Sequence, residues 1–403
     1  MKKWFALLLA VSMLFTLSAG ALAEGVTLKT VSSFAGTDAS ADAYTEILKA
    51  FEAETGNTVV DSSSTSDEAW KASVLNDFAA GNEPDVLFFF AASADSKPIL
   101  DKVVPIEEIN AAYPDLNLTE NAVLTEDDGK IYAIPSRPFW EGLFVNTDLF
   151  EEYGLELPTD WAKLEAAVAK FNEVGIVPIA VSLSDIPHYI AEFAIIACGT
   201  PEEHMARPKS LEEVPDSWYE GMELIAKLYE MGAFAKDVNA TTEAVTSQMF
   251  KDKKAAMQID GSWFANGIPQ SSMDTTIVIP FPTYAEDADP TAFIGGVSMG
   301  FYLTRKAWDD PEKRDEAVAL LAYLTNADSA AKLGGYQFSG KLLESSYEMI
   351  NNAKYMLSPF QDAMSKEARE TWLLGCIASV ADGSMSAQEC WEKVMTISPV
   401  FGD

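Results

Sequence analysis

Residues 130–161 read KIYAIPSRPFWEGLFVNTDLFEEYGLELPTDW and set the pattern for the rest of the chain. Alternating residues over 131–135 predict a strand, which the prolines that follow bring to an end. The apolar run 142–145 predicts a second strand, and NTDLFEEYG predicts a short helix that ends at Gly154. Between the two strands, residues 137–141 predict a rigid turn that carries an aromatic pair beside a carboxylate. This combination is suited to the floor of a cleft.

The first 23 residues have the features of a secretory signal peptide. Two lysines precede an apolar core, residues 5–17, and Ala21-Leu22-Ala23 forms a small-residue cleavage site. We therefore expect a mature chain that starts at Glu24 and is secreted across the cytoplasmic membrane, to the periplasm or the cell surface. No cysteine follows the apolar core, so the sequence contains no lipobox and leaves open how the protein is retained at the membrane.

The composition restricts the possible partners. The chain has 62 Asp and Glu against 28 Lys and Arg, a formal net charge of −34. A surface this acidic argues against nucleic acid and anionic lipid as partners, but not against a neutral ligand. The length predicts about two domains. Three cysteines are too few for a disulfide scaffold, and whether Cys376 and Cys390 pair stays open.

The first hundred residues of the mature chain alternate strands with helices. Continuous or alternating apolar runs predict strands at 28–31, 58–61 and 86–90, with an amphipathic helix after each of the first two. This order predicts a doubly wound parallel sheet. Ligands bind beyond the carboxyl ends of the strands in such sheets, so the loops 33–40 and 91–97 are candidate site segments.

The remaining chain predicts a second α/β unit followed by helices. Apolar patterns predict strands at 177–181, 255–259, 276–281 and 295–303, and helices at 191–198, 218–231, 244–250 and 311–324. The helix that begins at Trp161 has Thr159 or Asp160 as its N-cap.

Motifs for catalysis are absent from the sequence. His188 and His204 stand in no metal-ligand spacing, and no P-loop, Rossmann or G-x-S-x-G pattern occurs. We therefore predict that the protein is not an enzyme, has no metal site and needs no cofactor. A secreted carbohydrate-active enzyme stays an alternative, because carboxylate pairs are plentiful.

Several segments together resemble the family 1 extracellular solute-binding proteins of bacterial ABC sugar importers, which are maltose-binding-protein-like. The similar segments are YAIP (132–135), FVNTDLF (144–150), GNEPDVLFFF (81–90), FKDKKAAMQIDGSW (250–263), the run 293–325 and ADGSMSAQECWEKV (381–394). Four positions depart from the family pattern: Val145 replaces a Tyr, Thr147 a Lys and Lys253 a Gly, and Asp160 stands between Thr159 and Trp161. The resemblance covers almost all of the mature chain.

This resemblance implies a two-lobed periplasmic-binding-protein-like fold with three hinge crossings, each lobe a doubly wound sheet flanked by helices. The implied lobe one is 24–137 and 279–327, and lobe two is 138–278 and 328–403. Such a receptor captures a mono- or oligosaccharide between its lobes and delivers it to membrane permease subunits of an ABC importer. A monomer is expected. The same fold binding a polyamine or a peptide is an alternative.

A sugar site needs aromatic rings against C–H faces and carboxylates for hydroxyl groups. Trp263 follows the predicted strand 255–259 and is a candidate stacking platform. Trp140 is a second candidate platform, although packing at the hinge is as good an interpretation, and Glu141 is a candidate hydroxyl acceptor at a position where the family often meets its ligand.

Five further candidates come from strand ends. The family places ring-stacking and hydroxyl-binding side chains where Phe90 and Asp95 follow the third strand; Phe90 can equally be core. Asp38 can bind a hydroxyl or stabilise a turn. His188, expected in a loop, can bind the ligand or cap a helix. Gly296 allows close backbone approach or forms a β-bulge.

Overall fold

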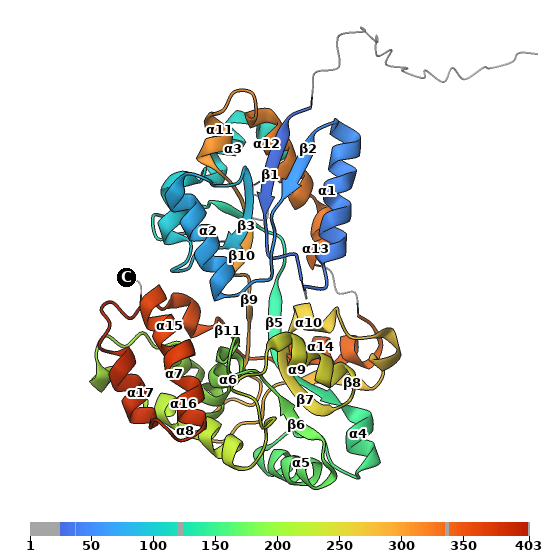
Figure 1. The fold of residues 1–403 in the computed structure, drawn as a ribbon, viewed down its shortest axis with the longest axis vertical. Helices are drawn as coiled ribbons and strands as arrows, with labels where there is room; N and C mark the ends of the chain where they lie inside the picture. Colours follow the sequence, from blue (N-terminus) through green and yellow to red (C-terminus); the bar gives the residue numbers. More distant parts are fainter. Residues whose placement is uncertain (1–24, 37, 119–123, 335–337, 402–403) are drawn as a thin grey trace, which may run out of the picture.

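The structure is a computed structural model that describes residues 25–36, 38–118, 124–334 and 338–401. It has two lobes, each built on its own β-sheet, and the chain crosses between them (Figure 1). The expected signal peptide lies outside the described residues. Within the described ranges, every helix is too short or too polar to span a bilayer.

The first lobe contains a five-stranded sheet in the order β2-β1-β3-β10-β4. Its first three strands are parallel, which confirms the predicted β-α-β-α-β unit, and β10 runs antiparallel between β3 and β4. Its strands are β1 (Thr27–Val31), β2 (Thr58–Asp61), β3 (Val86–Phe90), β4 (Ala133–Pro135) and β10 (Met299–Leu303). Its helices are α1 (Ala41–Thr55), α2 (Glu68–Ala80), α3 (Ile106–Ala112), α11 (Arg305–Asp309), α12 (Arg314–Thr325) and α13 (Ala327–Gly334), with 3₁₀ turns η1 (Lys97–Lys102) and η2 (Pro114–Leu116).

Helices cover both faces of this sheet, as the continuous apolar run of β3 predicts. Phe88 packs on the α1 and α12 side, where its ring stacks on that of Phe34 at 4.6 Å. Phe89 packs on the opposite face, with its ring centroid 5.3 Å from that of Trp70 on α2. The stack of Phe34 on Phe88 holds the loop after β1 against the end of the sheet, where the site lies.

The second lobe contains a sheet in the order β11-β9-β5-β7-β6, with β8 also paired to β5. Its strands are β5 (Phe139–Asn146), β6 (Val177–Ala180), β7 (Ala255–Gly261), β8 (Thr276–Ile279), β9 (Phe293–Gly296) and β11 (Met356–Leu357). Its helices are α4 (Thr147–Glu152), α5 (Trp161–Val174), α6 (His188–Cys198), α7 (Pro201–His204), α8 (Asp216–Glu230), α9 (Glu243–Lys251), α10 (Ser262–Ala265), α14 (Gly340–Asn352), α15 (Lys366–Gly375), α16 (Ile377–Ala381) and α17 (Ala387–Val394), with 3₁₀ turns η3 (Leu211–Glu213), η4 (Gln270–Ser272) and η5 (Phe360–Ala363).

Two local alternatives are settled by the structure. Asp160 is the N-cap of α5, since its carboxylate accepts a hydrogen bond of 3.0 Å from the backbone N–H of Lys163. Cys376 and Cys390 are both buried free thiols.

The predicted turn at residues 137–141 is wrong in its second half. Phe139, Trp140 and Glu141 form the start of β5, because their backbone groups pair with β9 and with the end of β7. The single strand predicted over 295–303 is also wrong. It is two strands in different sheets, and Gly296, with a φ of 147°, adopts a backbone conformation that favours glycine where the chain turns between them.

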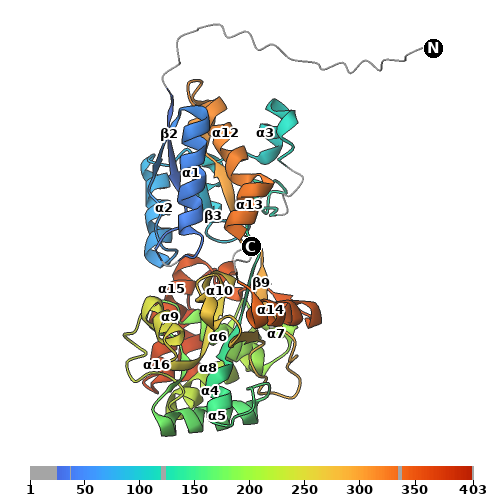
Figure 2. The same ribbon diagram turned by 90° about the vertical axis from the view of Figure 1, so that its right-hand side faces the viewer.

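Three segments join the lobes: β4 to β5, β9 to β10, and α13 to α14, the last of which includes residues outside the described ranges. β8 and β9 both pair with β5 in the second sheet, whereas α13 lies beside α1 in the first lobe (Figure 2). We propose lobe boundaries that follow this pairing, with the described residues of 25–137 and 298–334 in the first lobe and those of 138–297 and 338–401 in the second.

Candidate binding site

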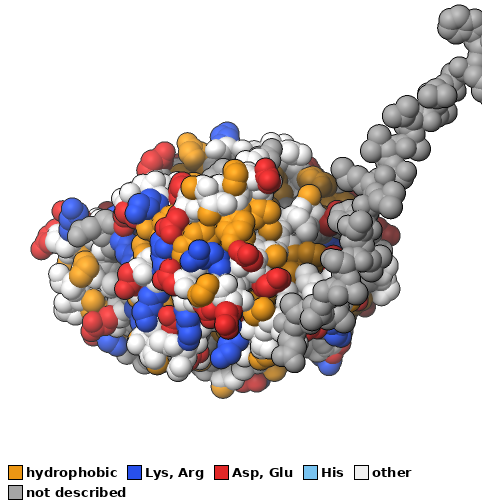
Figure 3. All heavy atoms as spheres, turned by 90° about the horizontal axis from the view of Figure 1, so that it is seen from above, with side chains coloured by type: hydrophobic (Ala, Val, Ile, Leu, Met, Phe, Trp, Pro, Cys, Tyr) orange, Lys and Arg blue, Asp and Glu red, His pale blue; other side chains and the backbone are white. Residues whose placement is uncertain are grey.

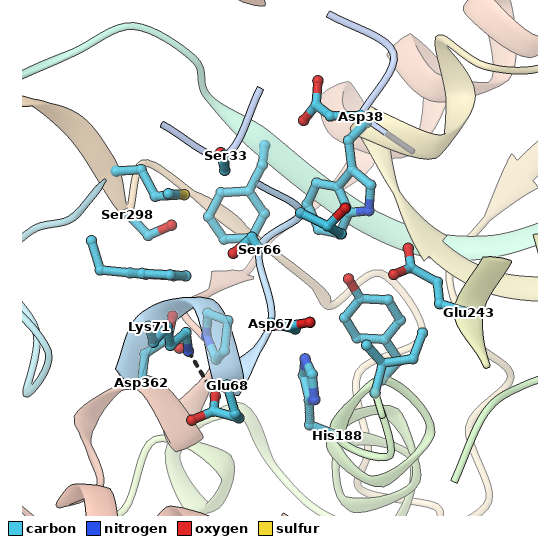
Figure 4. A pocket seen from close by; sticks show the side chains of 18 of the residues that line it. Ser33, Asp38, Ser66, Asp67, Glu68, Lys71, His188, Glu243, Ser298 and Asp362 are labelled. Carbon is cyan, nitrogen blue, oxygen red and sulfur yellow. Dashed lines mark ion pairs between the residues drawn. The ribbon is translucent and has the colours of Figure 1, made fainter. Parts of the chain in front are cut away.

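A cavity lies between the two lobes and is lined by residues of both (Figure 4). Most of the first-lobe lining comes from the carboxyl ends of β1, β2 and β3 and the segments that follow them, where the doubly wound topology places a ligand; Arg137 follows β4, and Ser298 and Met299 lie at the start of β10. The first lobe contributes Ser33, Ala35, Asp38, Thr65, Ser66, Asp67, Glu68, Lys71, Phe88, Phe90, Arg137, Ser298 and Met299. The second lobe contributes Phe139, Glu141, Asp185, Ile186, His188, Tyr189, Glu243, Trp263, Pro359, Gln361, Asp362 and Leu373.

Three rings of the second lobe, Phe139, Tyr189 and Trp263, form what we call the aromatic wall. The ring centroid of Trp263 lies 6.1 Å from that of Phe139 and 6.0 Å from that of Tyr189. Gly261 makes this arrangement possible, because a Cβ at that position would come within 2.4 Å of the Trp263 ring. The absence of a side chain at Gly261 thus lets the indole fold back over its own backbone.

Strand alternation on β5 sorts three candidate residues. Phe139 and Glu141 line the cavity, while Trp140 points to the opposite face of the sheet. Trp140 is 2% exposed and packs against Phe144 with a centroid distance of 5.8 Å. The structure therefore places Trp140 in the core and its neighbour Phe139 at the cavity.

Carboxyl groups of the second lobe lie beside the aromatic wall, and their environment disfavours their charged form. Burial raises the pKa of Glu141 well above its usual range, and the charges of Glu192, Asp260 and Asp362 add to the effect. Burial and the nearby carboxylates of Asp260 and Asp185 likewise raise the pKa of Glu243. These groups hold protons at a pH where exposed carboxylates are fully ionised.

Asp95 faces the other lobe rather than the cavity. It receives two hydrogen bonds of 2.8 Å from the guanidinium of Arg369 on α15, and both residues are almost fully buried. Lys71 lies 3.5 Å from Asp95, and Glu68 lies 3.3 Å from Arg369. Against the effect of its burial, the positive charges of Lys71 and Arg369 lower the pKa of Asp95. This ion-pair cluster joins the first lobe to the second.

The other predicted residues divide between the cavity and its surroundings. Asp38 lines the cavity, with its carboxylate 2.9 Å from the Arg137 guanidinium. Phe90 lines it with Lys71 Nζ 4.3 Å from its ring centroid. His188 also lines it, as the first residue of α6 rather than in a loop.

Gly296 does not line the cavity and instead pairs with Phe139 across the β5–β9 ladder. Of the eight candidates, the structure brings together Trp263, Glu141, Phe90, Asp38 and His188, and it does not bring Trp140, Asp95 or Gly296 to the cavity. The role of each in binding stays a prediction.

Several lining residues escaped the sequence analysis. Asp185 follows the carboxyl end of β6, so the same strand-end argument that selected Asp38 could have found it. Glu243 stands in the first turn of α9 without a local pattern that marks a site. Gln361 and Asp362 come from a distant segment, and only the tertiary fold places them at the cavity.

The site offers little for metal chemistry. Across the part of the chain that the structure describes, no group of three or more His, Cys, Asp or Glu is arranged to hold a metal ion. Burial, together with the charges of Lys71 and Arg369, lowers the pKa of His188 to about 3, so its imidazole is neutral at ordinary pH.

A two-lobed α/β fold with a polar and aromatic cavity between its lobes defines a solute receptor. Residues 46–355 match the sequence profile of the bacterial extracellular solute-binding proteins, and the chain belongs to this family. This membership confirms the predicted resemblance. It also implies a location outside the cytoplasm.

Relatives of known name and structure support the same class. The melibiose/raffinose/stachyose-binding protein MelE of Bacillus subtilis is 24% identical over 232 residues, which span 54% of this chain and about half, 52%, of that relative. The maltose/maltodextrin-binding domain of Bdellovibrio bacteriovorus bound to maltotriose has a TM-score of 0.71 at 18% identity and covers 92% of this chain and 98% of its own. A sugar transporter protein of Bacillus licheniformis in complex with stachyose has a TM-score of 0.70 at 17% identity with the same coverage. These structures confirm the two-lobed fold.

Proposed function

We propose that this protein captures a carbohydrate between its two lobes and delivers it to the membrane permease of an ABC importer. The observation that carries the proposal is the aromatic wall beside the carboxyl groups of Glu141 and Glu243, facing a polar first-lobe surface across the cavity. Rings cover the C–H faces of a saccharide and exclude water, and carboxyl groups accept hydrogen bonds from its hydroxyls. The saccharides named for its relatives support the same class of ligand.

Closure of the lobes is the functional event in this proposal. A ligand held against the aromatic wall touches the first lobe only when the lobes are together, so binding stabilises the closed form. The ion pair between Asp95 and Arg369 also stabilises the closed form, because it joins the two lobes beside the cavity. The permease then recognises the closed receptor.

The ligand leaves chemically unchanged in this proposal. The match to a family of solute-binding proteins supports this part of the proposal. We further propose that the protein acts as a monomer after removal of residues 1–23, in the periplasm or at the cell surface.

Thermal unfolding of the mature chain against a saccharide panel tests the proposal. The panel contains mono-, di- and oligosaccharides, including raffinose, stachyose and maltotriose. A ligand at ~1,000 times its Kd adds about 4 kcal/mol of apparent stability, which raises the midpoint measurably. Chromatography of the released ligand should show it uncut. A panel in which no saccharide raises the midpoint, or in which one is cleaved, would contradict the proposal.

A further inference from the structure

The lining of the cavity is strongly unbalanced in charge. Seven carboxyl side chains line it, against the two cationic side chains of Lys71 and Arg137. Both cations are already engaged by first-lobe acids, because Arg137 lies 2.9 Å from Asp38 and Lys71 lies 3.0 Å from Glu68. The excess of acidic side chains without a paired cation therefore falls mainly on the second lobe.

Three of the remaining carboxyls, Glu141, Asp185 and Glu243, form what we call the acidic wall. Asp185 accepts a hydrogen bond of 2.9 Å from the backbone N–H of Glu243, which holds the two acids side by side. Glu141 is only 5% exposed, and among the described residues its carboxyl has neither an ion pair nor a hydrogen bond. Charged or polar groups are rarely buried without a partner.

Lys251 is the cation that acts on the acidic wall from within the protein. Burial raises the pKa of Glu243 and of Asp260, and the positive charge of Lys251 offsets part of that rise. Its ammonium lies 5.2 Å from the ring centroid of Phe264, however, and it forms no ion pair with a described residue. One partly buried lysine at this distance forms an ion pair with none of these acids, so within the described residues Glu141 and Glu243 have no cation as a direct partner.

Two further observations, independent of the acids, indicate that a polar ligand belongs here. Ser33 Oγ and Gln361 Oε1 lie in side chains that are 3% and 5% exposed, and neither atom has a hydrogen-bond partner. Both residues line the cavity, one from each lobe, and Figure 4 shows Ser33 and Glu243 at the same opening. A buried polar atom without a partner costs about 1–3 kcal/mol, which a ligand could recover.

We infer that the saccharide bound by this receptor carries an ammonium group, which sits between the aromatic wall and the acidic wall. This inference rests on the proposed function and specifies its ligand as an amino-substituted sugar. A ring face attracts a cation, and Phe139, Tyr189 and Trp263 present three rings beside the carboxyls. A hydroxyl group in the same place leaves these carboxyls without a cation to stabilise their ionised form, whereas an ammonium group forms ion pairs with them.

Matched pairs of saccharides that differ only in an amino or a hydroxyl group at carbon 2 test the inference by calorimetry. The pairs are glucosamine and glucose, galactosamine and galactose, and the β-1,4-linked glucosamine trisaccharide and cellotriose, with spermidine as a separate probe. We expect the amino member of at least one pair to bind at least tenfold more tightly than its partner. Binding should also release protons, because the raised pKa values of Glu141 and Glu243 leave these two carboxyls partly protonated before the cation arrives.

Variants locate the effect in the acidic wall. Glu141→Gln with Glu243→Gln should reduce the preference for the amino member to less than threefold. Glu348→Gln removes one charge from an exposed acid on α14 outside the cavity and should leave the preference unchanged. The wild-type comparison stands on its own if the double variant does not fold.

The possible outcomes separate this inference from the proposed function. If neutral saccharides bind as tightly as their amino counterparts, the inference is wrong and the receptor for carbohydrates stands. If spermidine binds and no saccharide does, the proposed carbohydrate function is wrong, but the inference that the cavity binds an ammonium group stands. If none of the probes binds, the inference is overturned.

Discussion

The two sides of the cavity manage buried charge in opposite ways. On the first lobe, Arg137 and Lys71 each lie within 3.0 Å of a carboxylate of the same lobe. On the second lobe, Glu141 and Glu243 lie beside three aromatic rings and have no ion pair within the described residues. Side chains in ion pairs stabilise the structure of their own lobe, whereas carboxyls without an ion pair can accept hydrogen bonds from a ligand. The difference assigns structure mainly to one side and recognition mainly to the other.

Charges of both signs are mixed on the far end of the first lobe, where Lys and Arg side chains lie among Asp and Glu side chains (Figure 3). The second-lobe side of the cavity differs, because its lining contains acids and no Lys or Arg. Among the described residues, first-lobe acids form ion pairs with a cation of the other lobe only at the Asp95–Arg369 cluster beside the cavity. Substitutions in that cluster therefore test most directly whether paired charges stabilise the structure.

Replacing Arg369 by Met should have the largest effect. It leaves Asp95 buried without its guanidinium, and removal of one partner from a buried ion pair costs about 3–5 kcal/mol. The chain can avoid this cost by opening the lobes, since Asp95 and Arg369 belong to different lobes. We therefore expect a larger radius of gyration in solution scattering and a weaker affinity for the ligand.

The double variant Arg369→Met with Asp95→Asn is the control for that prediction. It removes the stranded charge, so it should recover much of the compactness and affinity that the single variant loses. Unchanged scattering and affinity in the single variant would mean that the pair does not hold the lobes together.

Trp263→Ala should have the next largest effect, on ligand binding. Truncation of a central aromatic anchor typically costs about 2 kcal/mol or more, a loss in affinity of roughly 30-fold. Trp140→Phe is the matched control, because Trp140 lies in the core on the other face of the sheet. It should lower the thermal midpoint and leave the affinity close to that of the wild type. Equal losses of affinity in both variants, measured by calorimetry, would contradict the assignment of the aromatic wall.

The sequence alone was sufficient where local pattern and fold agree. The apolar run 86–90 predicts a strand covered on both faces, and β3 is such a strand, with Phe88 and Phe89 in different cores. The strand-end argument led to Asp38 and Phe90, both of which line the cavity. Trp263 came from the resemblance to the family and lines the cavity as well.

Elsewhere the deciding partners lie far away along the chain. Residues 139–141 read as a turn because their partner strands, β7 and β9, begin more than a hundred positions later. With the strand missed, its alternation was missed too, and Trp140 was chosen in place of Phe139. Asp95 pairs with a residue 274 positions away, and no local pattern could reveal that its carboxylate is already occupied.

The pH dependence of stability tests the acidic side of the cavity. The pKa of Asp362 rises to about 6 through burial, and the pKa values of Glu141 and Glu243 are also raised. From about pH 5 upward the folded chain therefore binds more protons at these groups than the unfolded chain does, so this contribution to stability is lost as pH rises. The lowered pKa of His188 acts in the opposite direction below about pH 7, so the comparison is made above it: the ligand-free protein should melt at a lower temperature at pH 8.5 than at pH 7.

A matched variant shows where that loss arises. Glu141→Gln cannot ionise, so its midpoint should fall less between the two pH values. An unchanged slope would place the effect elsewhere in the chain, for example at other carboxyls whose folded pKa is raised.

Asp38→Asn should have the smallest effect on binding, although Asp38 lines the same cavity as Glu141. Its carboxylate is held by Arg137 at 2.9 Å, and the guanidinium also lies 5.0 Å from the ring centroid of Phe34, so the charge already serves the first lobe. We expect a loss of about 1 kcal/mol in the free energy of unfolding, as for a partly exposed ion pair, and a change in Kd below about threefold. Calorimetry and denaturant unfolding of Asp38→Asn and Glu141→Gln measure both quantities side by side. If Asp38→Asn weakens binding as much as Glu141→Gln does, then an internal partner does not withdraw a carboxylate from recognition, and the two sides of the cavity share that task.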